Sequence, residues 1–277
     1  MQTDYTVTVV FYSCGDSAVF CMLLILQMFE EVLMCRPDYF KVTYKINPWM
    51  SGNVDEELAM EQWQYLRSVI QECGKVVSVI EQSPELPDMV YLSNFRHSER
   101  QGERQHFKNW FLKEGYEVFS DDEYFFEGCG DASFSSKDLL WAGYGFRSEK
   151  AVYDNVCKLG DFRKVLCELV NERFYHMDVC FCALSSDLAL WYPKAFSEET
   201  QKRMKEEIEL IEVSDADANN FACNALAVDK TIILPTNCTD TRKVLENYGY
   251  QVKEVDMSEF MKSGGAVQCL VLKLYKF

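Results

Sequence analysis

The sequence predicts an α/β fold in which about five ββαβ units close into a ring, an α/β propeller. Three segments, which begin at residues 130, 177 and 222, share one order: short apolar strand, polar turn, second apolar strand, helix and a further strand. The turns SSKD, SSD and VDK have hairpin chemistry. The aromatic residues that close the hairpins recur at intervals of 51 and 50 residues, at Phe95, Phe146 and Phe196. A period of about 50 residues indicates units that bury their faces only against one another.

The other units follow from the same order of elements. Residues 31–50 and 58–80 predict another copy, and residues 88–119 predict strand, helix and strand. Residues 266–277 predict a closing strand, and a Ser, Thr or Asn before each helix of the three matched segments predicts a side-chain cap. We expect a domain over 31–277, with residues 1–30 as an atypical, disordered leader. A generic α/β fold with coincidental spacing is the alternative, and the three matched hairpins count against it.

One unit is predicted to be truncated near residues 90–91. The sequence DMV (88–90) runs directly into YLSNF, with no turn between them. By comparison with the other copies, the first strand of a hairpin and its turn are missing after Val90.

Charge and length restrict the classes of function. The chain has 277 residues and a formal net charge of −16, from 28 Lys and Arg against 44 Asp and Glu. Such a chain repels phosphate backbones, which counts against a nucleic-acid partner. A small cationic ligand suits it better, although solubility alone explains most of the acids.

The 12 cysteines do not resemble a disulfide framework, because many lie in apolar, strand-like runs such as VCFCAL. The apolar stretch at 18–29 is too short to span a bilayer, and acidic Asp4 and Asp16 precede it where a secretory signal has basic residues. We therefore expect a reducing, cytoplasmic location and no membrane partner.

Seven motifs occur in a fixed order, and together they resemble the pentein, or guanidino-group-modifying, superfamily. They are VLMCRPDYFKVTYKINPWM, DMVYLSNFRHSERQGE, FEGCGDASF, LWAGYGFRS, FYHMDVCFCAL, NALAV and SGGAVQC. The most similar branch is that of the dimethylarginine dimethylaminohydrolases and amidinotransferase-like proteins. The resemblance implies five ββαβ units around a polar channel and a covalent thiouronium intermediate.

Three residues are predicted to perform the chemistry. Cys269 follows two glycines that permit close backbone approach, and its position resembles that of the family's nucleophile. His176 and Asp178 are two residues apart, so a strand would turn both to one face, where the carboxylate would orient the imidazole. The histidine could then protonate a leaving amine and activate water.

Acids and arginines are predicted to bind the substrate. Glu127 and Asp131 lie in FEGCGD, and Asp88 lies in PDM; a carboxylate can pair with a planar guanidinium through two hydrogen bonds. The resemblance implies that the acid at Glu127 holds the guanidinium and contacts the histidine, while Asp131 more readily braces the turn. It also implies that Arg96 and Arg147 clamp a substrate carboxylate.

The expected function is hydrolysis of a C–N bond in an arginine-like guanidino compound, giving a citrulline-type product without a metal or organic cofactor. No cysteine or histidine group has zinc spacing. An amidinotransferase and a catalytically impaired binding protein are the alternatives. The resemblance supports the catalytically impaired protein, because family members have an Asn or Asp that contacts the guanidinium in the stretch that is missing here after Val90. The sequence leaves open whether the chain forms a homodimer.

Overall fold

The computed structural model describes residues 8–12, 29–92, 98–121 and 123–274, and the fold is mixed α/β as predicted. The described residues form four three-stranded sheets and one two-stranded sheet. No described helix is both long enough and apolar enough to cross a membrane. All ten cysteines in the described part of the chain are free, as the sequence predicts.

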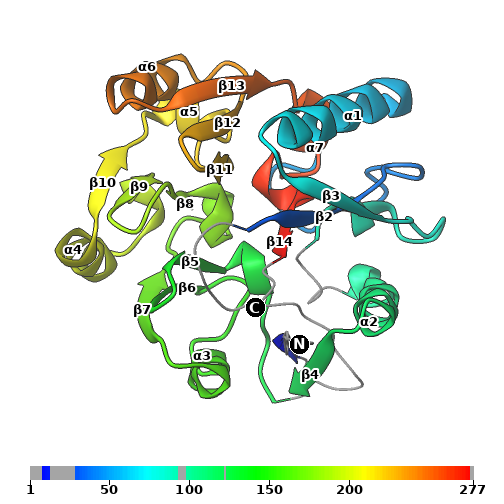
Figure 1. Cartoon of the computed structure of the whole chain (residues 1–277), viewed down its shortest axis with the longest axis horizontal. Coiled ribbons are helices and arrows are strands. Elements are labelled where there is room, and N and C mark those ends of the chain that lie inside the picture. Colours follow the sequence, from blue (N-terminus) through cyan, green and yellow to red (C-terminus); the bar gives the residue numbers. More distant parts are fainter. Residues whose placement is uncertain (1–7, 13–28, 93–97, 122, 275–277) are drawn as a thin grey trace, which may run out of the picture.

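Each three-stranded sheet contains an antiparallel pair followed by a parallel pair. We call the first strand of each sheet its inner strand, because these strands lie toward the middle of the ring of sheets (Figure 1). Written from inner to outer strand, the sheets are β14 (Leu272–Leu274), β2 (Glu31–Cys35) and β3 (Val76–Ile80); β5 (Ala132–Ser136), β6 (Leu139–Tyr144) and β7 (Arg163–Glu168); β8 (Phe181–Ala183), β9 (Leu188–Trp191) and β10 (Glu209–Glu212); and β11 (Leu226–Val228), β12 (Thr231–Pro235) and β13 (Gln251–Val255).

The longer helices lie on the outside of the sheets (Figure 1). In α1, Asp55 caps the first turn by accepting hydrogen bonds from the amides of Glu57 and Leu58, and the helix buries Trp63 and Leu66. The α-helices are α1 (Glu56–Glu72), α2 (Glu103–Lys113), α3 (Val152–Val156), α4 (Glu198–Glu207), α5 (Asp215–Asn219), α6 (Thr239–Asn247) and α7 (Ser258–Met261).

The three predicted hairpins are present as β5–β6, β8–β9 and β11–β12. In the last, Asp229 has φ +55°, a left-handed conformation that suits Asp in a tight turn. The predicted helix caps are only partly correct. Ser197 caps α4, but Ala151 and Cys238 precede α3 and α6 and provide no side-chain cap.

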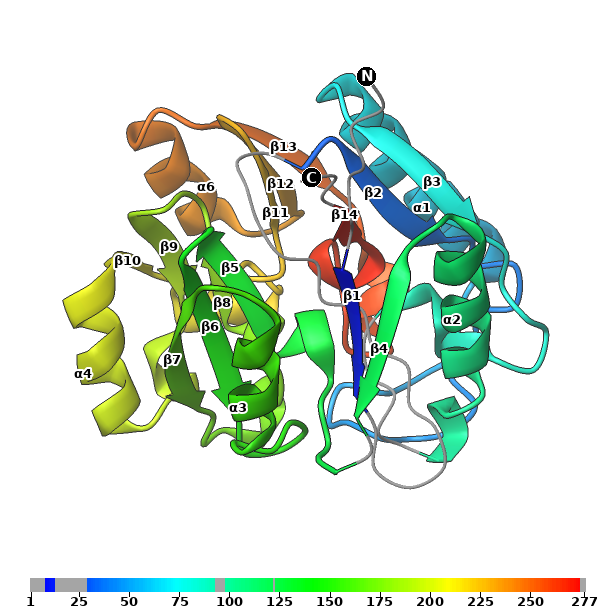
Figure 2. The ribbon, with the colours of Figure 1, turned by 60° about the horizontal axis from the view of Figure 1, so that its bottom comes forward.

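The fifth sheet, which belongs to the unit expected to be truncated, differs from the other four. Its two described strands are β1 (Thr8–Tyr12) and β4 (Glu117–Asp121), which pair in parallel, and α2 covers them (Figure 2). In the other sheets, the strand that pairs in parallel with the last strand is the middle one, so β1 takes the middle position. No inner strand pairs with it among the described residues. The predicted strand at the start of 88–119 is wrong for residues 88–90, which belong to the 3₁₀ helix η1 (Pro87–Val90).

Within the expected leader, residues 8–12 thus belong to a sheet of the domain. The division at residue 30 is otherwise still a prediction.

Short turns precede the inner strands. They contain the 3₁₀ helices η3 (Gly128–Gly130) before β5, η6 (Met177–Val179) before β8 and η8 (Gln268–Leu270) before β14, and residues 220–224 form a turn before β11. With η1 in the truncated unit, we call these segments the inner turns and define them as 87–90, 127–131, 176–179, 220–224 and 268–270. They carry nearly all of the predicted site residues.

Candidate active site

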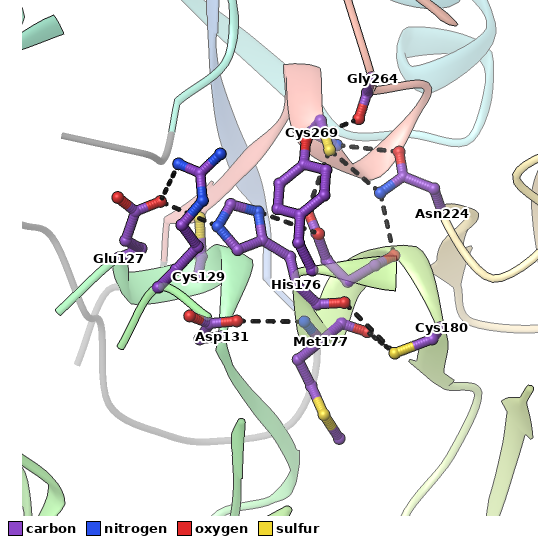
Figure 3. Close-up of polar contacts among 12 residues, drawn as sticks. Glu127, Cys129, Asp131, His176, Met177, Cys180, Asn224, Gly264 and Cys269 are labelled. Atoms are coloured by element: carbon purple, nitrogen blue, oxygen red, sulfur yellow. Dashed lines mark hydrogen bonds and ion pairs between the residues drawn. The ribbon is translucent and has the colours of Figure 1, made fainter. Parts of the chain in front are cut away.

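Glu127 and His176 meet between two inner turns. Nε2 of His176 lies 2.8 Å from Oε2 of Glu127, and both side chains are fully buried. Figure 3 shows the ring of His176 with Glu127 on one side and Cys269 on the other. Burial alone would raise the pKa of Glu127, but the Arg147 guanidinium and His176 together lower it to about 2. Glu127 is therefore a permanent carboxylate near neutral pH.

Arg147 joins this pair from the end of the β6 hairpin. Its Nη1 lies 3.4 Å from Oε2 of Glu127, its Nη2 donates to the carbonyl of Ile46 at 2.7 Å, and its guanidinium stacks 4.8 Å above the ring of Tyr175. The side chain is held in place by charge, hydrogen bonding and stacking together.

Cys269 lies against Asp178. Its Sγ is 3.0 Å from Oδ2 of Asp178, and the thiol donates to the carboxylate. Burial, and then the charge of Asp178, raises the pKa of the Cys269 thiol well above its usual value. Burial also raises the pKa of Asp178 to about 6. The unliganded site therefore holds a protonated thiol, and ionisation needs an added positive charge.

His176 is separated by a gap from the hydrogen-bonded pair of Cys269 and Asp178. Nδ1 of His176 is 4.0 Å from Oδ1 of Asp178, and neither atom has a hydrogen-bond partner in the described part of the chain. Buried polar atoms without hydrogen-bond partners are unusual in proteins as a whole. Those that do occur often mark a place where a ligand or water binds.

Two glycines shape the loop that carries Cys269. Gly264 has φ +93°, and a β-carbon there would lie 2.7 Å from Oδ1 of Asn47. A β-carbon on Gly265 would lie 2.6 Å from Cε1 of Tyr91 and 2.9 Å from Cβ of Cys269. Gly264 therefore supplies a left-handed conformation and Gly265 close approach, the two uses predicted from the sequence.

Asp131 braces the turn. Its Oδ2 accepts from the amide and hydroxyl of Ser148, at 3.2 and 2.6 Å, and its Oδ1 accepts from the amide of Met177 at 3.2 Å. Both oxygens are thus engaged by protein groups, and this geometry favours the bracing role over the substrate-binding role.

Asp88 lies on η1, on the truncated side of the site. It is almost fully buried, burial raises its pKa, and its Oδ1 accepts from the hydroxyl of Ser263 at 3.2 Å. Arg100 donates to the carbonyls of Asp88 and Tyr91, and it also forms a buried ion pair with Glu103. These contacts hold η1 beside the loop of Cys269.

The space beside Cys269 is narrow. Asp88, Arg147 and Cys269 line a cavity of about 10 Å³, which holds at most a single water. Arg147 and Tyr175 also line a neighbouring hollow of about 580 Å³. Ile46, Asn47, Arg147 and Tyr175 line both spaces.

The sequence prediction differs from the structure in two places. His176 and Asp178 do not share a strand: His176 precedes η6, Asp178 lies within it, and β8 begins only at Phe181. Cys269 lies in η8 rather than at the start of a strand. The predicted strand pattern was wrong because a short apolar run cannot be assigned to a strand by periodicity alone. Arg96 lies outside the described residues.

Sequence reasoning also missed Asn224, whose amide contacts Cys269 and Asp178. A signal was available, because Asn224 lies shortly before an inner strand, as the other site residues do. No group of three or more His, Cys, Asp or Glu side chains in the described part of the chain could hold a metal.

Comparison with known proteins gives concordant similarities. Residues 43–276 match the profile of a protein family described as N,N dimethylarginine dimethylhydrolase, eukaryotic. An uncharacterized protein of Caenorhabditis elegans is 46% identical over 261 residues, covering 88% of this chain and 94% of its own. The bifunctional arginine dihydrolase/ornithine cyclodeaminase ArgZ of Synechocystis is 40% identical over 265 residues, covering 88% of this chain but only 37% of its own.

Among solved structures, the N-terminal domain of ArgZ bound to product superposes with a TM-score of 0.85 at 40% identity. The match covers 88% of this chain and 97% of that domain, which is called an arginine dihydrolase from the ornithine-ammonia cycle. The similarity thus lies in the guanidino-modifying part of the bifunctional protein.

Proposed function

The chain belongs to the pentein superfamily and, within it, to the N,N-dimethylarginine dimethylhydrolase family, and from that premise we propose that it hydrolyses a C–N bond of an arginine-like guanidino compound. The proximity of Cys269, His176, Asp178 and Glu127 in one buried site carries this proposal. A ring of five ββαβ units, one of them truncated, is the arrangement that we infer for its scaffold, and it is supported by five sheets, four of which share one strand order.

Binding begins with the guanidinium. In this proposal Glu127, ionised at neutral pH, and Asp88 receive its N–H groups, because carboxylates match the planar donor pattern. The substrate carboxylate is proposed to bind Arg147 and, as the sequence resemblance implies, Arg96. The bound cation supplies the positive charge that the Cys269 thiol lacks in the unliganded site, so the thiol loses its proton only when substrate is present. That proton passes by way of Asp178, which accepts the thiol hydrogen bond, to His176.

The thiolate of Cys269 then attacks the guanidinium carbon. His176 donates a proton to the departing amine, and a thiouronium bonded to sulfur results. His176, now neutral, removes a proton from water, the hydroxide adds to the same carbon, and the C–S bond breaks. The products are an amine and a citrulline-type urea, and no external oxidant or reductant is required.

Two substrate classes are consistent with the relatives. The matching family profile carries dimethylarginine in its description, and ArgZ is called an arginine dihydrolase. We propose the dimethylarginine reaction. An acceptor amine in place of water would make the protein an amidinotransferase, and no feature of the site favours that reaction.

A catalytically impaired protein with a binding role is the second candidate. Two observations favour it: the cavity beside Cys269 is about 10 Å³, and the guanidinium of Arg147 lies on Glu127, where a substrate guanidinium would be expected. In this second candidate the protein retains Cys269, His176, Asp178 and Glu127 but turns over substrate only weakly.

A product assay tests the proposal. Arginine, asymmetric and symmetric dimethylarginine, monomethylarginine and agmatine are incubated with the protein, with and without glycine as acceptor amine. We expect a urea-type product from a methylated arginine, together with the methylamine or dimethylamine, and no dependence on glycine. A product formed only with glycine would identify a transferase. No product from any substrate would favour the impaired protein.

A further inference from the structure

We propose that Asn224 is a positioning residue for the proposed reaction, with its amide fixing the loop of Cys269 and donating a hydrogen bond that stabilises the thiolate. This inference rests on the proposed role of Cys269. It concerns an inner turn to which neither the sequence motifs nor the expected mechanism assigns a role.

The side chain of Asn224 is fully buried and makes four hydrogen bonds. Figure 3 shows Asn224 beside Cys269. Oδ1 accepts from the amides of Ala266 and Cys269, at 3.0 and 3.2 Å. Nδ2 donates to the carbonyl of Asp178 at 2.9 Å and to Sγ of Cys269 at 3.1 Å. Two acceptor sites and two donors are all that a carboxamide possesses, so its capacity is used completely.

These contacts determine which end of the amide faces the sulfur. Two backbone N–H groups can donate only to the carboxamide oxygen, so the NH₂ end must point to Sγ and to the carbonyl of Asp178. The sulfur therefore always meets a donor on this side. A donor favours the charged form of an acceptor, and in Cys269 that form is the thiolate.

Asn224 and Asp178 act on Cys269 in opposite directions. Asp178 accepts the thiol proton and favours the neutral form, whereas Asn224 donates and favours the anion. Because Nδ2 also holds the backbone carbonyl of Asp178, one amide fixes the two residues relative to each other. The sulfur thus lies between Asp178, which accepts the hydrogen bond of the thiol, and Asn224, which donates a hydrogen bond that stabilises the thiolate.

The internal repeat supports the same assignment. The other inner turns present Asp88, Glu127, His176 with Asp178, and Cys269 to the site. Asn224 lies in the remaining inner turn, two positions before the start of β11. Its backbone carbonyl also accepts from the amide of Gln268, so this turn contacts the Cys269 loop through both main chain and side chain.

Alkylation of Cys269 by iodoacetamide tests the proposal without any turnover. The rate is measured from pH 6 to pH 11 by mass spectrometry of the Cys269 peptide, which separates it from the other cysteines. Wild type is compared with Asn224→Asp, Asn224→Ala and Asn224→Ser. Asn219→Asp adds the same charge at an exposed position on α5 and serves as the matched control.

We expect the midpoint of the pH profile to move to higher pH in the order Asn224→Ser, Asn224→Ala, Asn224→Asp, with no movement for Asn219→Asp. The loss of one hydrogen bond to a charged group corresponds to about tenfold to hundredfold slower alkylation below the midpoint. Asn224→Asp is the most affected variant, although it is nearly isosteric, because it replaces the donor by a second carboxylate beside the sulfur.

A purely structural role predicts slower alkylation at every pH with an unmoved midpoint, and the slowing would be largest for Asn224→Ala, which leaves the largest cavity, and smallest for the nearly isosteric Asn224→Asp. Either result would overturn the proposal. Failure of all three variants to fold, judged by circular dichroism, would also overturn it, because Asn224 would then serve the scaffold alone. A shifted midpoint in a protein that turns over no guanidino substrate would keep Asn224 as a positioning residue and reject the proposed function.

Discussion

The complete unit β5–β6–β7 and the truncated unit β1–β4 differ in what they can present to the site. The complete unit has an inner strand, a tight hairpin and an inner turn in which Asp131 fixes the segment that carries Glu127. In the truncated unit, η1 is held by Arg100 and Ser263, and its sheet has no described inner strand. The reacting groups come from complete units, and the wall beside them comes from the truncated one.

The reacting residues and one wall of the cavity beside them therefore belong to different units of the fold. The Glu127–His176 pair and the Asp178–Cys269 pair each lie wholly within the complete units. The narrow cavity, in contrast, is lined by Asp88 and Tyr91 of the truncated unit. Substitutions on the complete side should therefore affect the reaction itself, and changes on the truncated side should affect stability and substrate entry.

The largest effect is expected from Cys269→Ser. A hydroxyl cannot replace a thiolate nucleophile at this site, so turnover should fall below detection while the fold persists. The measurement is product formation with the preferred guanidino substrate, with far-ultraviolet circular dichroism as the control for folding. Cys180→Ser is the matched control, since Cys180 is also buried but bonds only to main-chain carbonyls. Turnover near the wild-type rate in Cys269→Ser would remove the nucleophile from the mechanism.

His176→Ala should slow turnover by about 10²- to 10⁴-fold, the range expected for general acid–base help. Asp178→Asn should cost less, because it alters orientation and leaves the proton carrier in place. The pH–rate profile is measured for each variant with the same substrate. If neither substitution changes the profile, the two residues do not handle the proton.

Repair of the truncated unit should raise both melting temperature and turnover. In the repaired chain, the first strand and the turn of the corresponding hairpin of a related protein are inserted after Val90. Each buried backbone group that gains a partner contributes about 1–3 kcal/mol, a large part of a typical net stability of about 5–15 kcal/mol.

The role of β1 can be tested in the same pair of proteins. Deletion of residues 1–28 should destabilise the unmodified chain, in which β1 pairs with β4, and should affect the repaired chain much less. Equal stability and activity of the unmodified and repaired chains would show that the missing segment has no consequence.

The smallest effect concerns the pH dependence of stability. Burial raises the pKa of Asp178 from 3.8 to about 6, so above pH 6 the folded state contains a carboxylate that the unfolded chain ionises more easily. Asp178→Asn should therefore be more stable than wild type at pH 8, by about 1–3 kcal/mol. The advantage should shrink as the pH falls from 6 towards 4, because wild type then takes up the proton. Urea unfolding at pH 8 and pH 5 measures the difference, and a constant difference would contradict the assignment.

The sequence predicted most of the fold because periodic strands, hairpin turns and the repeat spacing are local signals. It also led to Cys269, His176 and Glu127, since the ordered motifs carry them. It did not predict the 3₁₀ geometry around His176 and Cys269, where short apolar runs are ambiguous between strand and turn. The pairing of β1 with β4 joins residues more than a hundred positions apart, and no local pattern specifies such a contact.

The role of Cys269 is tested most directly by trapping it. The protein is incubated with a haloamidine probe, digested, and the modified peptide is identified by mass spectrometry; a saturating guanidino substrate is added in a parallel sample. We expect one adduct per chain, on Cys269, that substrate suppresses and that Cys269→Ser lacks. Labelling of a different cysteine, or labelling of Cys269 that substrate does not suppress, would contradict the assignment of this site to guanidino chemistry.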